Sequence, residues 1–185
     1  ITCSFVQGRW KFMKNLFDFI TLDIETTGLD FRENEIIELG AVKYLSGEEK
    51  ERFSLFIKPQ DKIPLYIKQL THITDEQLAA GDSPASALKK LLEFCEDSLL
   101  VCHNQSFDIG FINARLETLG QPAIANPVLD TLELSRIYLP FLDNHKLSTL
   151  AEHFGITQEN AHRAIYDAET TGRVLLHLLD YIDSH

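Results

Sequence analysis

Two acidic side chains follow an apolar segment near the start of the chain, in the stretch FITLDIETTGLD. Asp23 and Glu25 lie one residue apart, and residues at that spacing in a strand point to the same side. Like charges placed this close are costly to ionise unless a cation compensates them. The alternative interpretation is a pair of exposed loop acids, which is the commoner situation for Asp and Glu.

Two further acids lie where predicted elements meet. Asp108 ends the stretch HNQSFD, directly after a short apolar strand, and we expect Ser106 to cap the helix that begins there. Asp167 ends HRAIYD and falls at the edge of the apolar stripe of the last predicted helix. An acid in a first helical turn is often merely stabilising. Ligands in α/β proteins, however, gather beyond the carboxyl ends of strands. We therefore expect Asp108 and Asp167 to share a pocket with Asp23 and Glu25.

Four converging carboxylates indicate a site for hard cations. Oxygen-only ligands favour Mg²⁺ or Mn²⁺ over zinc. Acidic clusters that hold two such ions roughly 3.5–4 Å apart serve phosphoryl transfer. The pattern therefore predicts phosphodiester cleavage with two ions in each site.

His162 is the candidate general base. It precedes Asp167 by five residues, which is about 140° around a continuous helix, so the two side chains cannot share one helical face. We therefore expect His162 to reach the site from the loop or first turn that leads into the helix. An imidazole with an ordinary pKa of about 6.5 is suited to take a proton from the attacking water.

The elements that must position these residues alternate in type. Hydrophobic patterning predicts an initial strand, an antiparallel hairpin and then alternating helices and strands. This order indicates an α/β fold with a mixed central sheet flanked by helices. Thr74 with Gln77, and Ser83 with Pro84, are predicted helix starts. The predicted strands are 17–22, 35–45, 51–59 and 99–102, a short strand leads into a helix within 126–139, and the other predicted helices lie within 71–81, 83–97, 106–120, 146–156 and 164–182.

Composition limits the class of protein. The chain has 185 residues and a net charge of −11, with 44% hydrophobic and 24% charged residues. We expect one globular domain over residues 13–185, and interpret residues 1–12 as either a leader or the end of a fragment. No apolar segment is long enough to span a membrane, so we expect a cytoplasmic protein. Three cysteines without CxxC spacing indicate neither disulfides nor zinc.

The charge of −11 argues against a broad basic surface for nucleic acid. Any such binding must then be local or mediated by cations. Either Lys and Arg line the substrate path, or a partner or companion domain supplies the additional contacts.

The three stretches together resemble the DnaQ-like 3′→5′ exonucleases, the family that includes proofreading subunits of bacterial DNA polymerase III. DIETTG, HNQSFD and HRAIYD match the three motifs of this family in order. His162 stands five residues before the last acid and Arg163 four before it, so the chain resembles the histidine branch, called DEDDh. The resemblance implies a ribonuclease H-like fold and a His162 general base. It also implies that the ligands of two metal ions are Asp23, Glu25, Asp108 and Asp167, and that the substrate contacts are Thr26, Gly28, Leu29, Asn104 and Phe107.

The leading functional hypothesis is therefore a metal-dependent enzyme that releases 5′-mononucleotides from a single-stranded or frayed 3′ end, with DNA favoured. The open alternatives are an exoribonuclease that trims RNA, a non-catalytic module that binds nucleic-acid ends or docks on a polymerase, and a cation-binding structural domain. The expected partners are nucleic acid and a polymerase subunit or companion domain, and no membrane.

Overall fold

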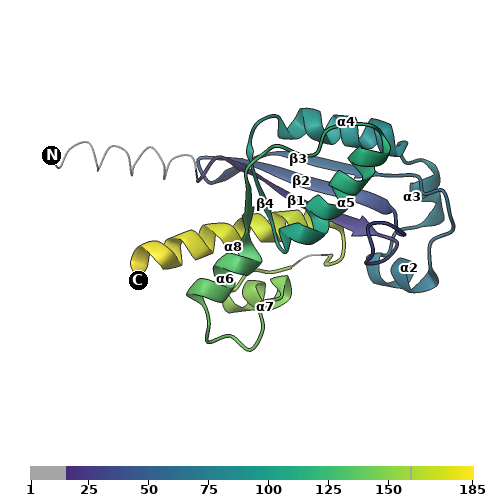
Figure 1. The fold of residues 1–185 in the computed structure, drawn as a ribbon. Helices are drawn as coiled ribbons and strands as arrows, with labels where there is room; N and C mark the ends of the chain where they lie inside the picture. The colour runs from purple at the N-terminus through teal and green to yellow at the C-terminus, as the bar shows by residue number, and fades with distance from the viewer. Residues whose placement is uncertain (1–15, 159) are drawn as a thin grey trace.

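A five-stranded mixed sheet forms the centre of the molecule in the computed structural model, which describes residues 16–158 and 160–185 (Figure 1). Its strand order is β3-β2-β1-β4-β5. The first three strands are antiparallel, and β4 and β5 run parallel to β1. The predicted mixed sheet with an initial antiparallel hairpin is confirmed, whereas the prediction for residues 1–12 lies outside the described residues. The strands are β1 Phe19–Thr26, β2 Ile36–Leu45, β3 Glu48–Phe56, β4 Leu99–Cys102 and β5 Val128–Asp130.

Strand β1 is longer than the sequence predicted. It continues to Thr26 because β2 pairs with it along its whole length, opposing Gly40 to Asp23 and Glu38 to Glu25. The two acids therefore lie within the strand and not beyond its end. The β2–β3 turn is also tighter than expected: Ser46 and Gly47 both have positive φ, and β3 begins at Glu48.

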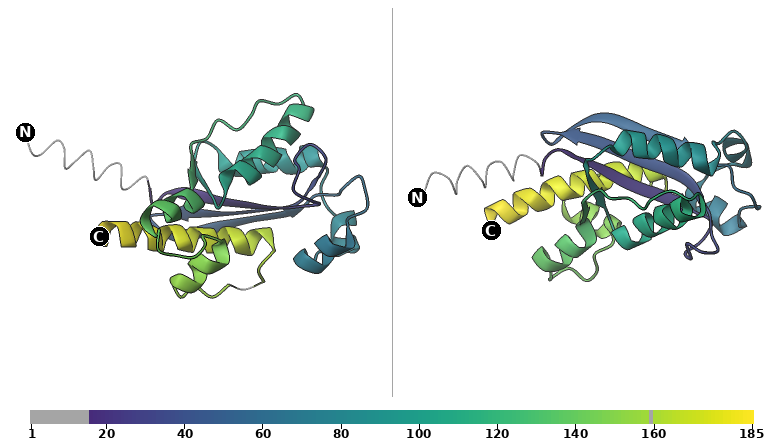
Figure 2. Two further views of the ribbon diagram at one scale, coloured as in Figure 1. Left: turned by 60° about the horizontal axis from the view of Figure 1, so that its bottom comes forward. Right: turned by 45° about the horizontal axis from the view of Figure 1, so that its top comes forward.

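Helices cover both faces of the sheet. Figure 2 shows, in its left view, α4 and α5 on one side and α8 on the other. Helices α4 (Pro84–Cys95) and α5 (Gln105–Thr118) pack on the face that carries Ile20, Leu22 and Ile24. Helix α8 (Ala164–Ser184) packs on the opposite face, which includes Phe19, Val42 and Tyr44. The odd-numbered residues of β1, including both acids, therefore face α8.

Two of the predicted helix starts are confirmed. Thr74 and Gln77 form the capping box of α3 (Asp75–Ala79), and the Ser83 side chain accepts a hydrogen bond from the Ser86 N–H at the start of α4. The prediction for Ser106 is wrong. Helix α5 begins one residue earlier, with Asn104 in a left-handed conformation at its N-cap. The Ser106 hydroxyl donates to the Asn104 side chain instead, at 3.0 Å.

Helix α8 also buries residues that lie outside its predicted apolar stripe. Val174 and Leu178 pack with Leu139 and Leu150 in a second cluster formed with α6 (Thr131–Tyr138) and α7 (Leu147–His153). This cluster fixes α6 and α7 on the side of the sheet that α8 covers. In the part of the chain that the structure describes, no helix combines the length and the apolar composition needed to cross a membrane.

Helix α2 (Leu65–Thr71) was not predicted from the sequence. It has no side-chain N-cap, because Pro64 occupies that position. Ile63 and Ile67 anchor it in a small cluster with Ile37 of β2. This cluster places α2 and α3 at the end of the sheet where β1 ends (Figure 1).

Candidate active site

Three acids from two elements meet on the α8 side of the sheet. Asp23 and Glu25 project from β1, and Asp167 comes from the first turn of α8. One side-chain oxygen from each lies within 4.8 Å of the corresponding oxygens of the other two. The structure thus brings together acids 142–144 residues apart in the sequence. The spacing of these oxygens is small enough for one cation to contact all three.

Asp108 approaches the same place from the opposite face of the sheet. Strand β1 pairs with β4 only over Phe19–Thr21, so the backbone of β1 beyond that point has no strand neighbour on this side. The Ile24 N–H donates to Asp108 Oδ1 at 3.1 Å. Asp108 is buried, and its charge acts on both Asp23 and Glu25. It lies beside the three-acid cluster, although its oxygens fall outside the 4.8 Å set.

Burial and mutual repulsion raise the pKa of all four acids when no cation is bound. Burial, and then the charge of Asp167, raises the pKa of Glu25 to about 8. Burial raises the pKa of Asp108 to about 8 despite the hydrogen bonds that favour its ionised form. The pKa values of Asp23 and Asp167 are raised as well, chiefly by burial. A divalent cation would reverse this balance by stabilising the carboxylates.

His162 lies just before α8, as the five-residue spacing required. Its φ is 65°, an uncommon value for a residue other than glycine. Its backbone N–H donates to Asp167 Oδ2 at 2.9 Å, and its side chain is exposed. The tight turn at His162 therefore holds Asp167, and the His162 side chain is close enough for its charge to offset part of the rise in the pKa of Asp167.

A buried ion pair that the sequence did not suggest attaches α8 to the sheet. Glu38 lies on β2 opposite Glu25 and is fully buried. Its carboxylate accepts hydrogen bonds from the Arg163 guanidinium at 2.9–3.2 Å and from the Ala164 N–H at 3.2 Å. The guanidinium also lies over the Phe56 ring, 5.2 Å from its centroid. Arg163 stands between His162 and Ala164, so this pair fixes the segment that carries Asp167.

We expect Arg163→Met to destabilise the protein by about 2–4 kcal/mol, because it leaves the Glu38 charge buried without its partner. For a chain of this size the loss corresponds to a fall in Tm of about 4–16 °C. Calorimetry or thermal denaturation monitored by circular dichroism measures it.

The matched control replaces both partners. The double variant, Glu38→Leu with Arg163→Met, has no buried carboxylate left without a partner. We therefore expect it to recover at least half of the Tm that Arg163→Met loses. A double variant as unstable as Arg163→Met would show that the pair does not account for the loss.

The predicted substrate contacts occupy two different settings. Thr26 is buried and its hydroxyl donates to the Gly28 carbonyl, whereas Leu29 is 86% exposed. A Cβ at Gly28 would collide with the Asn34 side chain, which explains the glycine in this turn. Phe107 packs against Phe111 of the core, with ring centroids 4.8 Å apart. The fifth predicted contact, Asn104, is exposed at the start of α5.

Helix α2 adds exposed apolar residues next to the Thr26–Leu29 turn. Leu65 and Tyr66 are 70% and 59% exposed, and the Tyr66 hydroxyl lies 3.5 Å from the Thr27 carbonyl. The sequence analysis did not single them out. The buried Ile63 and Ile67, four residues apart, were the signal for the helix that carries them.

Comparison with known proteins points to nucleases. The profile of the family RNase_T, described as Exonuclease, matches residues 20–175. A DNA polymerase III of PolC type from Halalkalibacterium halodurans is 45% identical over 158 residues, which are 85% of this chain and 11% of the relative. The PolC-type enzyme of Streptococcus pyogenes serotype M18 is 40% identical over 168 residues, 90% of this chain and 12% of the relative. The chain therefore spans only a small part of each relative's length.

Solved structures share the fold at low sequence identity. Exonuclease I from E. coli in complex with a dA16 oligonucleotide has a TM-score of 0.75 at 20% identity, covering 90% of this chain and 43% of that one. The nuclease domain of 3′hExo, a DEDDh family member bound to rAMP, has a TM-score of 0.79 at 17% identity, covering 89% and 92%. The expected ribonuclease H-like fold is confirmed.

Proposed function

The chain belongs to the RNase_T exonuclease family, and from that premise we propose that it is a two-metal 3′→5′ exonuclease acting on DNA. One observation carries the proposal: side-chain oxygens of Asp23, Glu25 and Asp167 lie within 4.8 Å of one another, beside the buried Asp108. An acidic cluster of this kind is expected in a family that generally depends on divalent metals.

The residues present fit hard divalent cations. We propose Asp23, Glu25, Asp108 and Asp167 as the ligands of two Mg²⁺ or Mn²⁺ ions, since the donors are all carboxylate oxygens. The raised pKa values of Glu25 and Asp108, caused chiefly by burial, support this proposal, because buried carboxyl groups are costly to ionise unless a cation compensates them. When bound, the ions supply charge stabilisation at the attacking and leaving oxygens.

The proposed reaction hydrolyses the last phosphodiester bond of a strand. Water attacks the phosphorus atom, the bond to the 3′ oxygen of the penultimate nucleotide breaks, and the terminal nucleotide leaves as a 5′-monophosphate. We assign to His162 the proton that the attacking water loses. The backbone hydrogen bond from His162 to Asp167 supports this role, because it keeps the main chain of His162 next to the acids.

The terminal nucleotide is proposed to lie on the turn that follows β1. The exposed Leu29 offers a surface for its base or sugar, and Leu65 and Tyr66 of α2 extend that surface. The edge of Phe107 would add to this surface, and Asn104, at the start of α5, is a further proposed substrate contact. These contacts require an unpaired end, which agrees with a single-stranded or frayed 3′ terminus.

Proofreading is the role that we propose for this activity. The relatives at 40–45% identity are PolC-type DNA polymerases III, which makes DNA the favoured substrate. We also propose that polymerase segments act with this chain and that it works in the cytoplasm. An exonuclease I structure with a dA16 oligonucleotide supports the choice of single-stranded DNA.

A DNA strand labelled at its 5′ end tests both polarity and metal dependence. With Mg²⁺ or Mn²⁺ we expect a ladder that shortens one nucleotide at a time from the 3′ end. Excess chelator should lower the rate below about 1% of its starting value, because the charge stabilisation at the reacting oxygens is lost. Adding back Mn²⁺ should restore it.

A terminal 3′-phosphate should hinder digestion, and an RNA strand of the same sequence should be cut more slowly. Full activity in excess chelator would exclude the metal assignment. Preference for RNA would instead favour the exoribonuclease alternative, and no cleavage of either strand would favour a module that binds ends without cutting them.

A further inference from the structure

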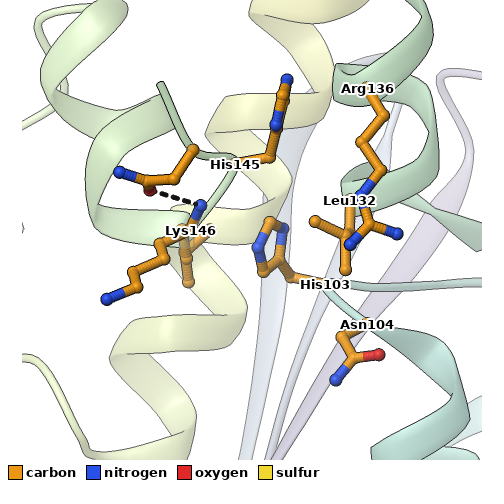
Figure 3. Close-up of a pocket in the computed structure, with 8 residues that line it drawn as sticks. His103, Asn104, Leu132, Arg136, His145 and Lys146 are labelled. Atoms are coloured by element: carbon orange, nitrogen blue, oxygen red, sulfur yellow. Dashed lines mark hydrogen bonds between the residues drawn. The ribbon is translucent and has the colours of Figure 1, made fainter. Parts of the chain in front are cut away.

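A cavity of about 550 Å³ opens where β4 and β5 end, next to α6 and α7 (Figure 3). In the view of Figure 3 the His103 ring lies between Lys146 and the Arg136 guanidinium. Four of the described lining residues have basic side chains and none has an acidic one. Such a surface is unexpected in a chain of net charge −11. We call this cavity the basic pocket; its lining residues are His103, Asn104, Leu132, Arg136, Asn144, His145, Lys146 and Leu147.

The two permanent charges of the basic pocket are available to an anion. Within residues 16–158 and 160–185, no carboxylate oxygen lies within 4 Å of the Lys146 amino group, which is exposed. Arg136 pairs with Glu133 at 2.6 Å, but both side chains are more than half exposed. Exposed pairs of this kind contribute about 0–1 kcal/mol. Arg136 can therefore exchange this partner for a phosphate at little cost.

Asp130, whose charge acts on His103 of the pocket, has its carboxylate engaged by backbone N–H groups. Both carboxylate oxygens of Asp130 accept backbone N–H groups, from Asn104 and Leu132 at 2.9 Å and from Gln105 at 3.0 Å. These bonds tie the start of α5 to the start of α6 and stabilise the Asp130 charge. Asp130 is thus a structural acid next to the pocket, and the acid that pairs with a basic group of the lining is the exposed Glu133.

The rest of the lining suits the sugar of a nucleotide. The Thr131 hydroxyl lies 3.2 Å from the Cys102 carbonyl oxygen and 3.0 Å from His103 Nδ1, and the hydrogen bond between Thr131 and His103 fixes the ring. The flat face of His103, with Leu132 and Leu147, gives the pocket apolar walls. A volume of about 550 Å³ exceeds that of a bare phosphate and is sufficient for a nucleotide unit.

The basic pocket shares a segment with one of the proposed metal ligands. Asn104 lines the pocket, and Asp108 follows it by four residues in α5, about 6 Å along a helix axis. A strand covers that distance with roughly one to three nucleotides, at a rise of about 3.4 Å or more for each. The turn proposed for the terminal nucleotide lies on the other side, because α2 packs on β2 while the pocket lies at β4 and β5.

We propose that the basic pocket binds a backbone phosphate and sugar of the substrate strand, one to three nucleotides upstream of the bond that is cut. The inference rests on the proposed function. It makes Lys146 and Arg136 determinants of strand binding and leaves the chemistry to the acids. Local phosphate contacts also explain how a chain of net charge −11 holds DNA.

Two substrates separate this inference from the proposed function. One is a single-stranded DNA of about 12 nucleotides, within the range of known single-strand site sizes. The other is the p-nitrophenyl ester of thymidine 5′-monophosphate, which has a reacting phosphodiester and no upstream nucleotide. The variants are Lys146→Ala, Arg136→Ala and their combination. The matched control is Lys89→Ala, an exposed lysine on α4 across the sheet.

For the double variant we expect the KM for the oligonucleotide to rise about 10–50-fold, with kcat within about 2-fold, since the lost contacts are phosphate contacts. The dependence of log KM on log salt should become shallower by about 1. The loss should be confined to the oligonucleotide and absent in Lys89→Ala. Equal losses on both substrates would overturn the proposed role of the basic pocket, and so would an oligonucleotide KM within 2-fold of the parent value. In either case, turnover by the parent protein would still support the proposed function.

A methylphosphonate placed at successive linkages of the oligonucleotide identifies the phosphate involved. We expect one linkage, one to three nucleotides upstream, where the neutral substitution weakens binding to the parent protein about 5–10-fold and to the double variant by less than 2-fold. Fluorescence anisotropy in Ca²⁺ measures binding of the oligonucleotide without turnover. It therefore tests whether the pocket binds a backbone phosphate even if no hydrolysis is found. Equal sensitivity of both proteins at every linkage would refute the assignment.

Discussion

Asp108→Asn should lower exonuclease activity by about 10³-fold or more and, without metal, make the protein more stable. The expected loss follows from the proposed role of Asp108, because a neutral amide cannot replace an anionic ligand of ions that stabilise charge on the reacting oxygens. The fold is preserved, because Asn can still accept the hydrogen bond that the Ile24 N–H donates to Asp108 at 3.1 Å. Single-turnover rates on single-stranded DNA measure the loss.

The gain in stability follows from the raised pKa of Asp108. Its pKa is about 8 in the folded protein, against an ordinary value of 3.8. Between these values the unfolded chain ionises the carboxyl and the folded protein keeps it protonated. This group therefore stabilises the metal-free fold fully below pH 3.8 and progressively less as the pH rises towards 8. Asn does not titrate and avoids this loss.

The difference between variant and parent should therefore grow with pH. We expect Asp108→Asn to raise the free energy of unfolding by about 1–3 kcal/mol at pH 8 in chelator, which is a Tm gain of about 2–12 °C, and by less at pH 5. Adding Mn²⁺ should stabilise the parent more than the variant. A variant that is less stable than the parent at pH 8 in chelator would contradict the electrostatic account of the site.

Local patterns in the sequence were sufficient to locate the acids. Asp23 and Glu25 share a face because strand residues alternate, and the capping signals at Thr74 and Ser83 act within one helical turn. His162 had to precede the last helix because of its spacing from Asp167. Each of these expectations depends on geometry that spans only a few residues.

Features set by distant segments could not be predicted in this way. Helix α5 starts at Gln105 and not at Ser106 because Asp130, from β5, accepts the N–H groups of Asn104 and Gln105. In the sequence, Arg163 indicated only which of two branches of the family the chain resembles. Its partner Glu38 lies 125 residues away, and nothing near either residue indicates the pair.

The length of β1 has the same origin. Residues beyond Leu22 include two acids, which are disfavoured in strands, so composition ended the predicted strand too early. Pairing of the whole of β1 with β2 overrides that local preference. The two acids proposed as metal ligands therefore occupy a strand that their own propensities do not support, as expected where a site conflicts with local stability.

Gly40→Ala should reduce stability and activity together. A Cβ at Gly40 would lie 2.5 Å from the Ala164 carbonyl oxygen, and closer still to the carbonyl carbon. These are backbone atoms at the start of α8, so no side chain can move aside. Gly40 opposes Asp23 in the β1–β2 register, and Glu38, two residues away on the same face, binds Arg163. The methyl group would therefore push the segment of His162 and Asp167 away from the β1 acids.

We expect Gly40→Ala to lower the free energy of unfolding by about 2–4 kcal/mol, at or above the usual cost of overpacking. Activity per folded molecule should fall about 10–100-fold, because displacement of a reacting group by about 1 Å costs up to 10²-fold. Thermal denaturation and initial rates below the Tm measure the two effects separately.

Two glycine variants locate the cause. Gly110→Ala makes the same chemical change inside α5, where the nearest atom to a new Cβ is 3.8 Å away, so it should be neutral or slightly stabilising. Gly172→Ala would meet the Tyr44 ring at 2.5 Å, under the same helix but about 12 Å along α8 from Ala164. It should lower stability with little loss of activity per folded molecule. Equal losses of activity in Gly172→Ala and Gly40→Ala would be explained by a general loosening of α8. A loss confined to Gly40→Ala would instead show that catalysis depends on the contact between β2 and the first turn of α8.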